Sequence, residues 1–176
     1  AGCTLIGVIR MEYEGRTTWY VLNIGDSRVY LHRGDRLIQL TRDHSLHSEL
    51  LSEGRPGAEA VPRNVITRAL GSDDTRHDAW LLPIETGTRV LVCSDGLTNE
   101  VDDEQLRAVL CAGGRADAVG EELLRRALDA GGHDNVTLVV ADVISGGAAP
   151  AVAGSDDRAL ETTLETTVDR TLPGRR

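Results

Sequence analysis

The sequence predicts one α+β domain, in which mainly antiparallel strands form sheets and helices pack on the outside of those sheets. Three observations support this expectation. The chain of 176 residues has the length of a single domain. Most of its apolar runs have the short length and β-branched content of strands, and two later segments have helical periodicity. The ordered domain is expected over residues 1–144, and a linker with a tail over residues 145–176.

The first four strands are expected to form two hairpins. Residues 3–9 and 17–24 are β-rich runs, and the polar stretch 12–16 separates them at a hairpin-like spacing. The dipeptide Gly34-Asp35 suits a two-residue primed turn. The strands expected on either side of it are Ser27–Arg33 and Arg36–Leu40.

In the middle of the chain, the spacing of the apolar residues changes from that of strands to that of a helix. A short helix is expected before Gly54, where leucines recur four residues apart and the glycine follows at the position of a C-cap. Two prolines within residues 55–64 indicate an exposed loop. Strand character returns at 77–83 and 88–94, and the almost unbroken apolar run of the second indicates a central, buried strand.

Two helices and a last strand complete the expected domain. Asp102 and Gln105 resemble a capping box that opens a helix through Leu110. A second helix is expected over 115–130 and a buried strand over Val136–Ile144. The apolar stripe of the second helix, and the glycine that stops it, are Ala116, Val119, Leu123, Ala127 and Gly131.

Composition excludes several classes of protein. A formal net charge of −9 argues against nucleic acid or an anionic membrane surface as a partner. No apolar stretch reaches the roughly 18 residues that a membrane span requires. The three cysteines are widely spaced and form no CxxC pair, which indicates free thiols and a cytoplasmic protein.

Three apolar runs each end at an aspartate among small residues, and these aspartates are Asp26, Asp95 and Asp134. A single aspartate in a turn usually caps nearby backbone N–H groups. Three of them at the edges of buried strands are costly without a counter-charge, which hard divalent cations would supply. The five histidines carry no such argument; His44 and His47 are expected in the solvated first turn of a helix.

Three other kinds of phosphate-binding or nucleophilic site do not match the sequence when they are tested on the segment Val92–Asn99. A haloacid-dehalogenase site needs an aspartate where Cys93 stands, and a cysteine phosphatase needs an arginine where Asn99 stands. No GKS/T loop for a nucleotide exists. Cys93 is therefore interpreted as a buried strand residue.

Five motifs, taken in order, resemble the bacterial, actinobacterial-like branch of the PP2C (PPM) family of metal-dependent protein serine/threonine phosphatases. The resemblance extends from Ala1 to about Ile144. The motifs are Ile24-Gly25-Asp26-Ser27-Arg28-Val29-Tyr30, Leu40-Thr41-Arg42-Asp43-His44-Ser45, Asn64-Val65-Ile66-Thr67-Arg68-Ala69-Leu70-Gly71, Cys93-Ser94-Asp95-Gly96-Leu97 and Asp134-Asn135-Val136-Thr137.

The resemblance implies a fold and an activity. The fold would be an α/β/β/α sandwich of two stacked, mainly antiparallel sheets with outer helices. The activity would be hydrolysis of phosphoserine and phosphothreonine by a hydroxide that bridges two Mn²⁺ or Mg²⁺ ions. Asp95 and Asp134 would be ligands of the core ions, and Asp26 would belong to a possible third site. The implied partners are phosphorylated proteins and a cognate serine/threonine kinase with its substrates.

The sequence also departs from the family pattern. The phosphate-gripping Arg…Asn-Glu-Asp segment has no match, nor has the Asp-Gly-Met-Gly-Gly-His loop that carries the metal-bridging aspartate. These would lie upstream of Ala1, so the chain is expected to hold the C-terminal three-fifths of the domain. Residues 1–176 alone are therefore expected to be inactive.

The tail suggests a competing function. It repeats Glu-Thr-Thr on a polar stretch and resembles phosphothreonine motifs that bind forkhead-associated (FHA) domains. The candidate threonines are Thr162, Thr163, Thr166 and Thr167. The alternative is thus a catalytically incomplete PP2C-like interaction module whose phosphorylated tail docks FHA domains. A low-complexity, solvating tail remains open as well.

Overall fold

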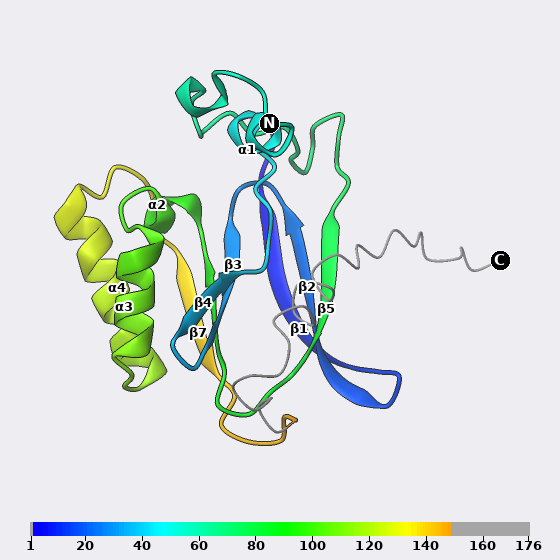
Figure 1. The fold of residues 1–176 in the computed structure, drawn as a ribbon, viewed down its shortest axis with the longest axis vertical. Coiled ribbons are helices and arrows are strands. Elements are labelled where there is room, and N and C mark those ends of the chain that lie inside the picture. The colour runs from blue at the N-terminus through cyan, green and yellow to red at the C-terminus, as the bar shows by residue number, and fades with distance from the viewer. Residues whose placement is uncertain (1, 149–176) are drawn as a thin grey trace.

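The computed structural model describes residues 2–148, which form two stacked antiparallel sheets and one layer of helices (Figure 1). The threonine motif of the tail lies outside the described residues. One sheet has the order β1-β2-β5 and the other the order β4-β3-β6-β7. The strands are β1 (Leu5–Tyr13), β2 (Arg16–Ile24), β3 (Arg28–Arg33), β4 (Arg36–Gln39), β5 (Asp78–Pro83), β6 (Arg89–Cys93) and β7 (Leu138–Asp142).

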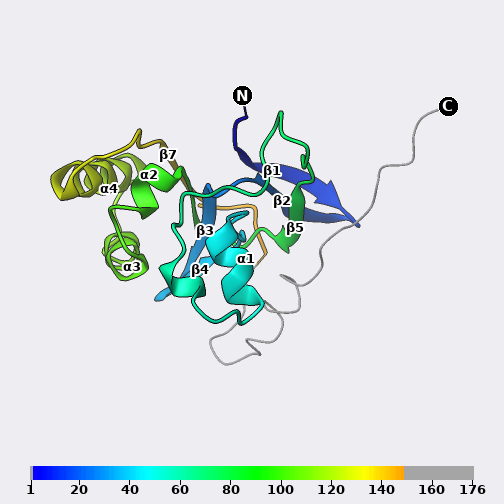
Figure 2. The same cartoon turned by 90° about the horizontal axis from the view of Figure 1, so that it is seen from above.

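The helices are placed unequally around the sheets. Helices α3 (Asp103–Cys111) and α4 (Ala116–Ala130) cover the outer face of the four-stranded sheet (Figure 2). The short helices α1 (Leu46–Ser52), η1 (Ala58–Ala60) and α2 (Asp95–Thr98) lie near one end of the sheets. The expected α+β fold is confirmed. Within residues 2–148, however, no helix packs on the outer face of the three-stranded sheet, where Leu5, Ile9 and Tyr13 are 42–50% exposed.

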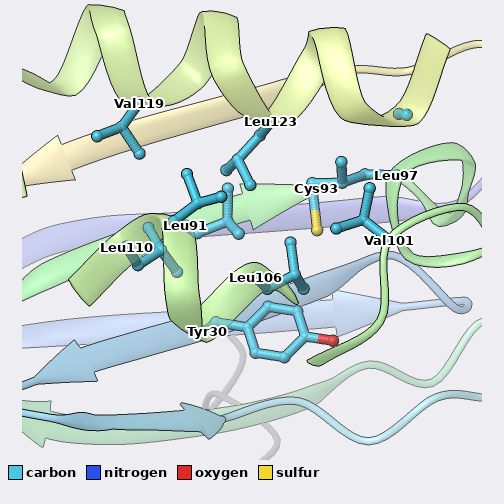
Figure 3. Close-up of a cluster of buried hydrophobic side chains, with 11 residues drawn as sticks. Tyr30, Leu91, Cys93, Leu97, Val101, Leu106, Leu110, Val119 and Leu123 are labelled. Carbon is cyan, nitrogen blue, oxygen red and sulfur yellow. The ribbon is translucent and has the colours of Figure 1, made fainter. Parts of the chain in front are cut away.

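Two hydrophobic clusters hold the layers together. The cluster between the sheets contains Val29 and Leu31 of β3 and Val90 of β6, together with Val21 and Trp80 from the other sheet. The second cluster lies between the four-stranded sheet and the helices (Figure 3). It takes the alternate strand residues, since successive side chains of a strand point to opposite faces. Its members include Tyr30, Leu91, Leu106, Leu110 and Leu123.

Most of the expected elements are confirmed. Strand β6 is central in its sheet, and Gly34 forms the β3–β4 turn with φ of +63°. Asp102 and Gln105 form a capping box in which each side chain bonds the other's backbone N–H. The stripe on α4 is buried at Val119, Leu123 and Ala127 and half-buried at Ala116, and the helix ends at Gly131.

Two expectations are wrong in detail. The first hairpin turn contains only Glu14 and Gly15, with φ of +50° and +73°, so the polar residues around them belong to β1 and β2. Strand β7 is an edge strand rather than a buried one, and Val139 is 59% exposed. The reason is that α4 covers only one face of β7 and the other sheet does not extend over it.

Candidate metal centre

Three aspartates lie beyond the same end of the four-stranded sheet. In the strand register, Arg28 of β3 lies beside Cys93 of β6, which lies beside Leu138 of β7. Because these strands are antiparallel, the residues before β3, after β6 and before β7 all project beyond this row. Asp26, Asp95 and Asp134 occupy those positions. They lie at the end of the sheet where α2 begins (Figure 1).

The turn that carries Asp26 is tightly built. Gly25 has φ of +110°, and a Cβ atom there would lie 2.4 Å from Cγ2 of Thr4. Only glycine suits both the backbone angle and the close approach of β1. The hydroxyls of Thr4 and Ser27 are 3.3 Å apart, which ties the turn to the start of the chain. Asp26 is consequently held in place and only 8% exposed.

Asp26 and Asp95 interact electrostatically. Burial raises the pKa of the Asp26 carboxyl, and the negative charge of Asp95 raises it further. Asp43 adds a smaller unfavourable effect. A backbone hydrogen bond at Asp26 partly offsets these effects, and the Arg28 guanidinium adds a smaller favourable effect. Nη2 of Arg28 lies 2.7 Å from Oδ2 of Asp43. A divalent cation at this position would remove the repulsion between the two carboxylates.

Asp95 opens helix α2 immediately after β6. The hydroxyl of Ser94 donates to the carbonyl of Asn135 at 3.1 Å and accepts from the N–H of Thr137 at 3.1 Å. Gly96 allows this approach, because a Cβ atom there would lie 2.4 Å from the Asn135 carbonyl oxygen. The connection before β7, and Asp134 with it, is therefore fastened to the strand end that carries Asp95.

Asp134 lies on the exposed side of the group. Its Oδ1 accepts from the N–H of Asn135 at 2.6 Å, the cap that any turn aspartate can make. The neighbouring His133 places Nδ1 2.7 Å from Oε1 of Glu100, and this contact lowers the pKa of the Glu100 carboxyl. The loop thus has two anchors, Ser94 and Glu100.

The oxygen donors suit Mg²⁺ or Mn²⁺ in kind, although they do not surround an ion. Within residues 2–148 no three histidine, cysteine, aspartate or glutamate side chains are grouped closely enough to hold a metal ion. The structure brings the three strand ends together and makes Asp26 and Asp95 neighbours. An ion there would need further ligands.

One residue in this region contradicts the expectation from sequence. His44 is 2% exposed and does not lie in a solvated helical turn. Helix α1 begins at Leu46, two residues after His44, because Ser45 is its N-cap and accepts from the N–H of Ser48. The cap signal at Ser45 could have shown that His44 precedes the helix, where a side chain can turn inward.

Comparison with known proteins identifies relatives over part of the chain. The serine/threonine phosphatase Stp of Listeria innocua is 39% identical over 110 residues, which are 60% of this chain and 42% of that protein. The solved structure of the PPM Ser-Thr phosphatase MsPP of Mycobacterium smegmatis, in complex with cacodylate, has a TM-score of 0.70 and 35% identity. It matches over 81% of this chain and 62% of its own.

A second solved structure holds metal. The catalytic domain of the serine/threonine phosphatase PstP, in complex with two manganese ions, has a TM-score of 0.69 and 36% identity over 81% of this chain and 59% of its own. The chain thus spans less than two thirds of the length of each of these proteins, and no family model matches it. None of the helices described between residues 2 and 148 has the length and apolar character to span a bilayer. The shared fold, the level of identity and the ordered motifs together show that the chain is similar in sequence and fold to the PP2C (PPM) serine/threonine phosphatases over the part of them that it spans.

Proposed function

We propose that this chain is part of a metal-dependent protein serine/threonine phosphatase and that Asp26, Asp95 and Asp134 are ligands of its metal ions. The substrates would be proteins phosphorylated on serine or threonine, including a cognate kinase and its targets. The ions would be Mn²⁺ or Mg²⁺, and two manganese ions are bound in one relative.

One observation carries the proposal. Aspartates from three separate strand ends lie beyond the same register row of the four-stranded sheet, and the charge of Asp95 adds to burial in raising the pKa of the Asp26 carboxyl. Structural aspartates are normally paired with a cation or with backbone donors. The carboxylate of Asp26 has a backbone hydrogen bond, but its pKa is raised all the same by burial and by the charge of Asp95. A divalent ion would supply the missing counter-charge.

The side chains of the chain itself have limited tasks in this reaction. Asp26, Asp95 and Asp134 would hold and orient the ions, and Ser94, Gly96 and the His133–Glu100 pair would keep their loops in register. The ions, when bound, would lower the pKa of water and neutralise charge on the phosphoryl group. Because the described residues do not enclose an ion, we expect the 176-residue chain alone to hydrolyse phosphopeptides at background rate.

The decisive experiment compares two proteins, the 176-residue chain and the full product of the reading frame that encodes it. A phosphothreonine peptide is offered to each with Mn²⁺, and phosphate release is measured. We expect hydrolysis by the full product and a loss of about 100-fold or more in its Asp95→Asn variant. Asp35→Asn is the control, since Asp35 is exposed in the β3–β4 turn at the opposite end of β3.

Two results would contradict the proposal. If the full product with Mn²⁺ released no phosphate while the Asp95→Asn variant bound Mn²⁺ as well as the parent, the metal site would be misassigned. If the parent bound Mn²⁺ and phosphoprotein without turnover, the chain would instead belong to the incomplete interaction module.

A further inference from the structure

The buried imidazole of His44 connects the Asp26 turn to a distant strand. Its Nδ1 lies 3.1 Å from the backbone nitrogen of Gly25, the residue before Asp26. Its own backbone N–H donates to the Gly25 carbonyl at 2.9 Å. On the other side of the ring, Nε2 lies 3.1 Å from Oδ2 of Asp78, the first residue of β5.

These contacts fix the tautomer of the ring. The N–H of Gly25 can only donate, so Nδ1 must carry the lone pair. The single ring proton of neutral His44 is then on Nε2, which donates it to Asp78. Nη1 of Arg68 also lies 3.3 Å from Nε2, but both nitrogens would be donors there. The hydrogen bond of Arg68 therefore goes to Oδ1 of Asp78, at 3.0 Å.

On the side of Asp78, the His44 ring is held by several further hydrogen bonds. Asp78 accepts from His44 with one carboxylate oxygen and from Arg68 with the other. The contact with His44 lowers the pKa of the Asp78 carboxyl in spite of its partial burial, and Arg68 adds a smaller effect in the same direction. Thr67 adds a backbone link by donating to the His44 carbonyl at 2.9 Å. The ring is thus fixed on the side away from Gly25.

At Gly25, the other end of this connection, the backbone has an unusual conformation. Gly25 has φ of +110° and lies against Thr4, so its peptide group tolerates little movement. Its carbonyl accepts from Asn23 as well as from the backbone N–H of His44, whereas its N–H is directed at the imidazole. The orientation of the peptide between Ile24 and Gly25, one residue before Asp26, therefore depends on a side chain nineteen positions after Gly25 in the sequence.

We propose that His44 is a positioning residue for the metal site. It would hold the Gly25 N–H through Nδ1, with Asp78 and Arg68 fixing the ring, so that the Asp26 carboxylate is aimed before any ion arrives. This role rests on the proposed function, because it assumes that Asp26 is a ligand. Hydrogen-bonded partners that orient metal ligands typically change metal affinity about 10- to 100-fold when they are removed.

Two half-isosteres of the imidazole separate this role from a purely structural one. In His44→Asn the side-chain oxygen replaces Nδ1 as the acceptor for Gly25 but cannot reach Asp78. In His44→Gln the side-chain nitrogen replaces Nε2 as the donor to Asp78 but leaves the Gly25 N–H without its acceptor. Each variant loses one hydrogen bond of a buried ring, so the two should lose similar amounts of stability.

The readouts are the Mn²⁺ affinity of the full product of the reading frame and amide hydrogen exchange at Gly25 and Asp26 in the metal-free 176-residue chain. We expect His44→Asn to bind Mn²⁺ within about threefold of the parent. We expect His44→Gln to lose about tenfold or more and to exchange the Gly25 amide faster. Equal metal affinity in the two variants, with equal exchange at Gly25, would overturn the proposal.

A measurement on the unmodified chain covers the case in which a variant does not fold. Nitrogen-15 spectra of the His44 ring should show a protonated Nε2, an unprotonated Nδ1 and a scalar coupling from Nδ1 to the Gly25 amide. A protonated Nδ1 would refute the arrangement. If the parent bound no Mn²⁺, the proposed function would fail, while the ring spectra and the Gly25 exchange would still decide whether His44 holds this turn.

Discussion

The carboxylate of Asp26 is placed where it destabilises the metal-free fold. It is buried, it faces the charge of Asp95, and Arg28 is already bonded to Asp43. Buried carboxylates with a raised pKa are frequent at functional sites, so we expect Asp26 to contribute little to folding and more to metal binding. Removal of its charge should therefore have opposite effects on stability with and without metal.

Asp26→Asn is predicted to raise the thermal midpoint of the metal-free chain at neutral pH by a few degrees. The reason is that the amide carries no charge to bury beside Asp95, while it can keep the backbone contact of the turn. In the full product of the reading frame, the same variant should lose the stabilisation that saturating Mn²⁺ gives the parent, about 2.7 kcal/mol at 100 times the dissociation constant. Calorimetry with and without Mn²⁺ checks both effects. Asp35→Asn should show neither, and a fall in the metal-free midpoint of Asp26→Asn would contradict the account.

The sequence predicted the positions of the three aspartates but not the environment of His44. An aspartate at the end of an apolar run is a local pattern, and strand ends meet wherever strands pair. The burial of His44 depends on Asp78 and Gly25, which lie 34 and 19 positions away. No local periodicity encodes such contacts. The expectation that His44 and His47 lie in the solvated first turn of a helix is therefore wrong for His44.

The turn between β2 and β3 is tightly constrained, and Gly25 tests this. Gly25→Ala should lose about 3 kcal/mol or more of the free energy of unfolding, because left-handed strain adds to a 2.4 Å clash with Thr4. Gly54→Ala is the matched control. Its φ is +63° with no atom within 4 Å of a new Cβ, so strain alone should cost about 1–2 kcal/mol. Urea unfolding measures both, and equal losses would show that β1 can yield at Thr4.

Helix α4 gives a second comparison within one element. Leu123 is fully buried against the four-stranded sheet, whereas the next residue, Leu124, is 39% exposed. Leu123→Ala should lose about 2–5 kcal/mol of unfolding free energy, and Leu124→Ala less than about 1 kcal/mol. If the two losses were similar in urea titrations, the side of α4 that faces the sheet would be wrongly assigned.

Element prediction succeeded where signals were local. The capping box at Asp102, the Gly34 turn and the α4 stripe each need only a few neighbouring residues to be recognised. The burial of β7 could not be predicted, because an apolar run does not reveal whether the strand is central or at an edge. Val139 is exposed since its strand closes one side of a sheet that the other sheet does not cover there.

At the scale of the whole molecule, the layers are held by two clusters that meet at the four-stranded sheet. Strands β3 and β6 contribute to both, Val29 and Val90 on one face and Tyr30 and Leu91 on the other. A sheet that is buried on both faces couples the two clusters, so the described part of the chain should unfold as one cooperative unit.

Cysteine reactivity can test this cooperativity without a new probe. Cys93 is at the end of β6 in the cluster under the helices, and burial raises the pKa of its thiol to about 12, whereas Cys3 and Cys111 are exposed. In native buffer, a disulfide reagent should therefore modify two thiols quickly and the third only through global opening. In a Cys3→Ser/Cys111→Ser variant, Cys93 is the remaining thiol. The urea concentration at which Cys93 becomes reactive should match the concentration at which the circular dichroism signal is lost. A third thiol that reacts well below that transition would show that α3 and α4 separate from the sheet on their own.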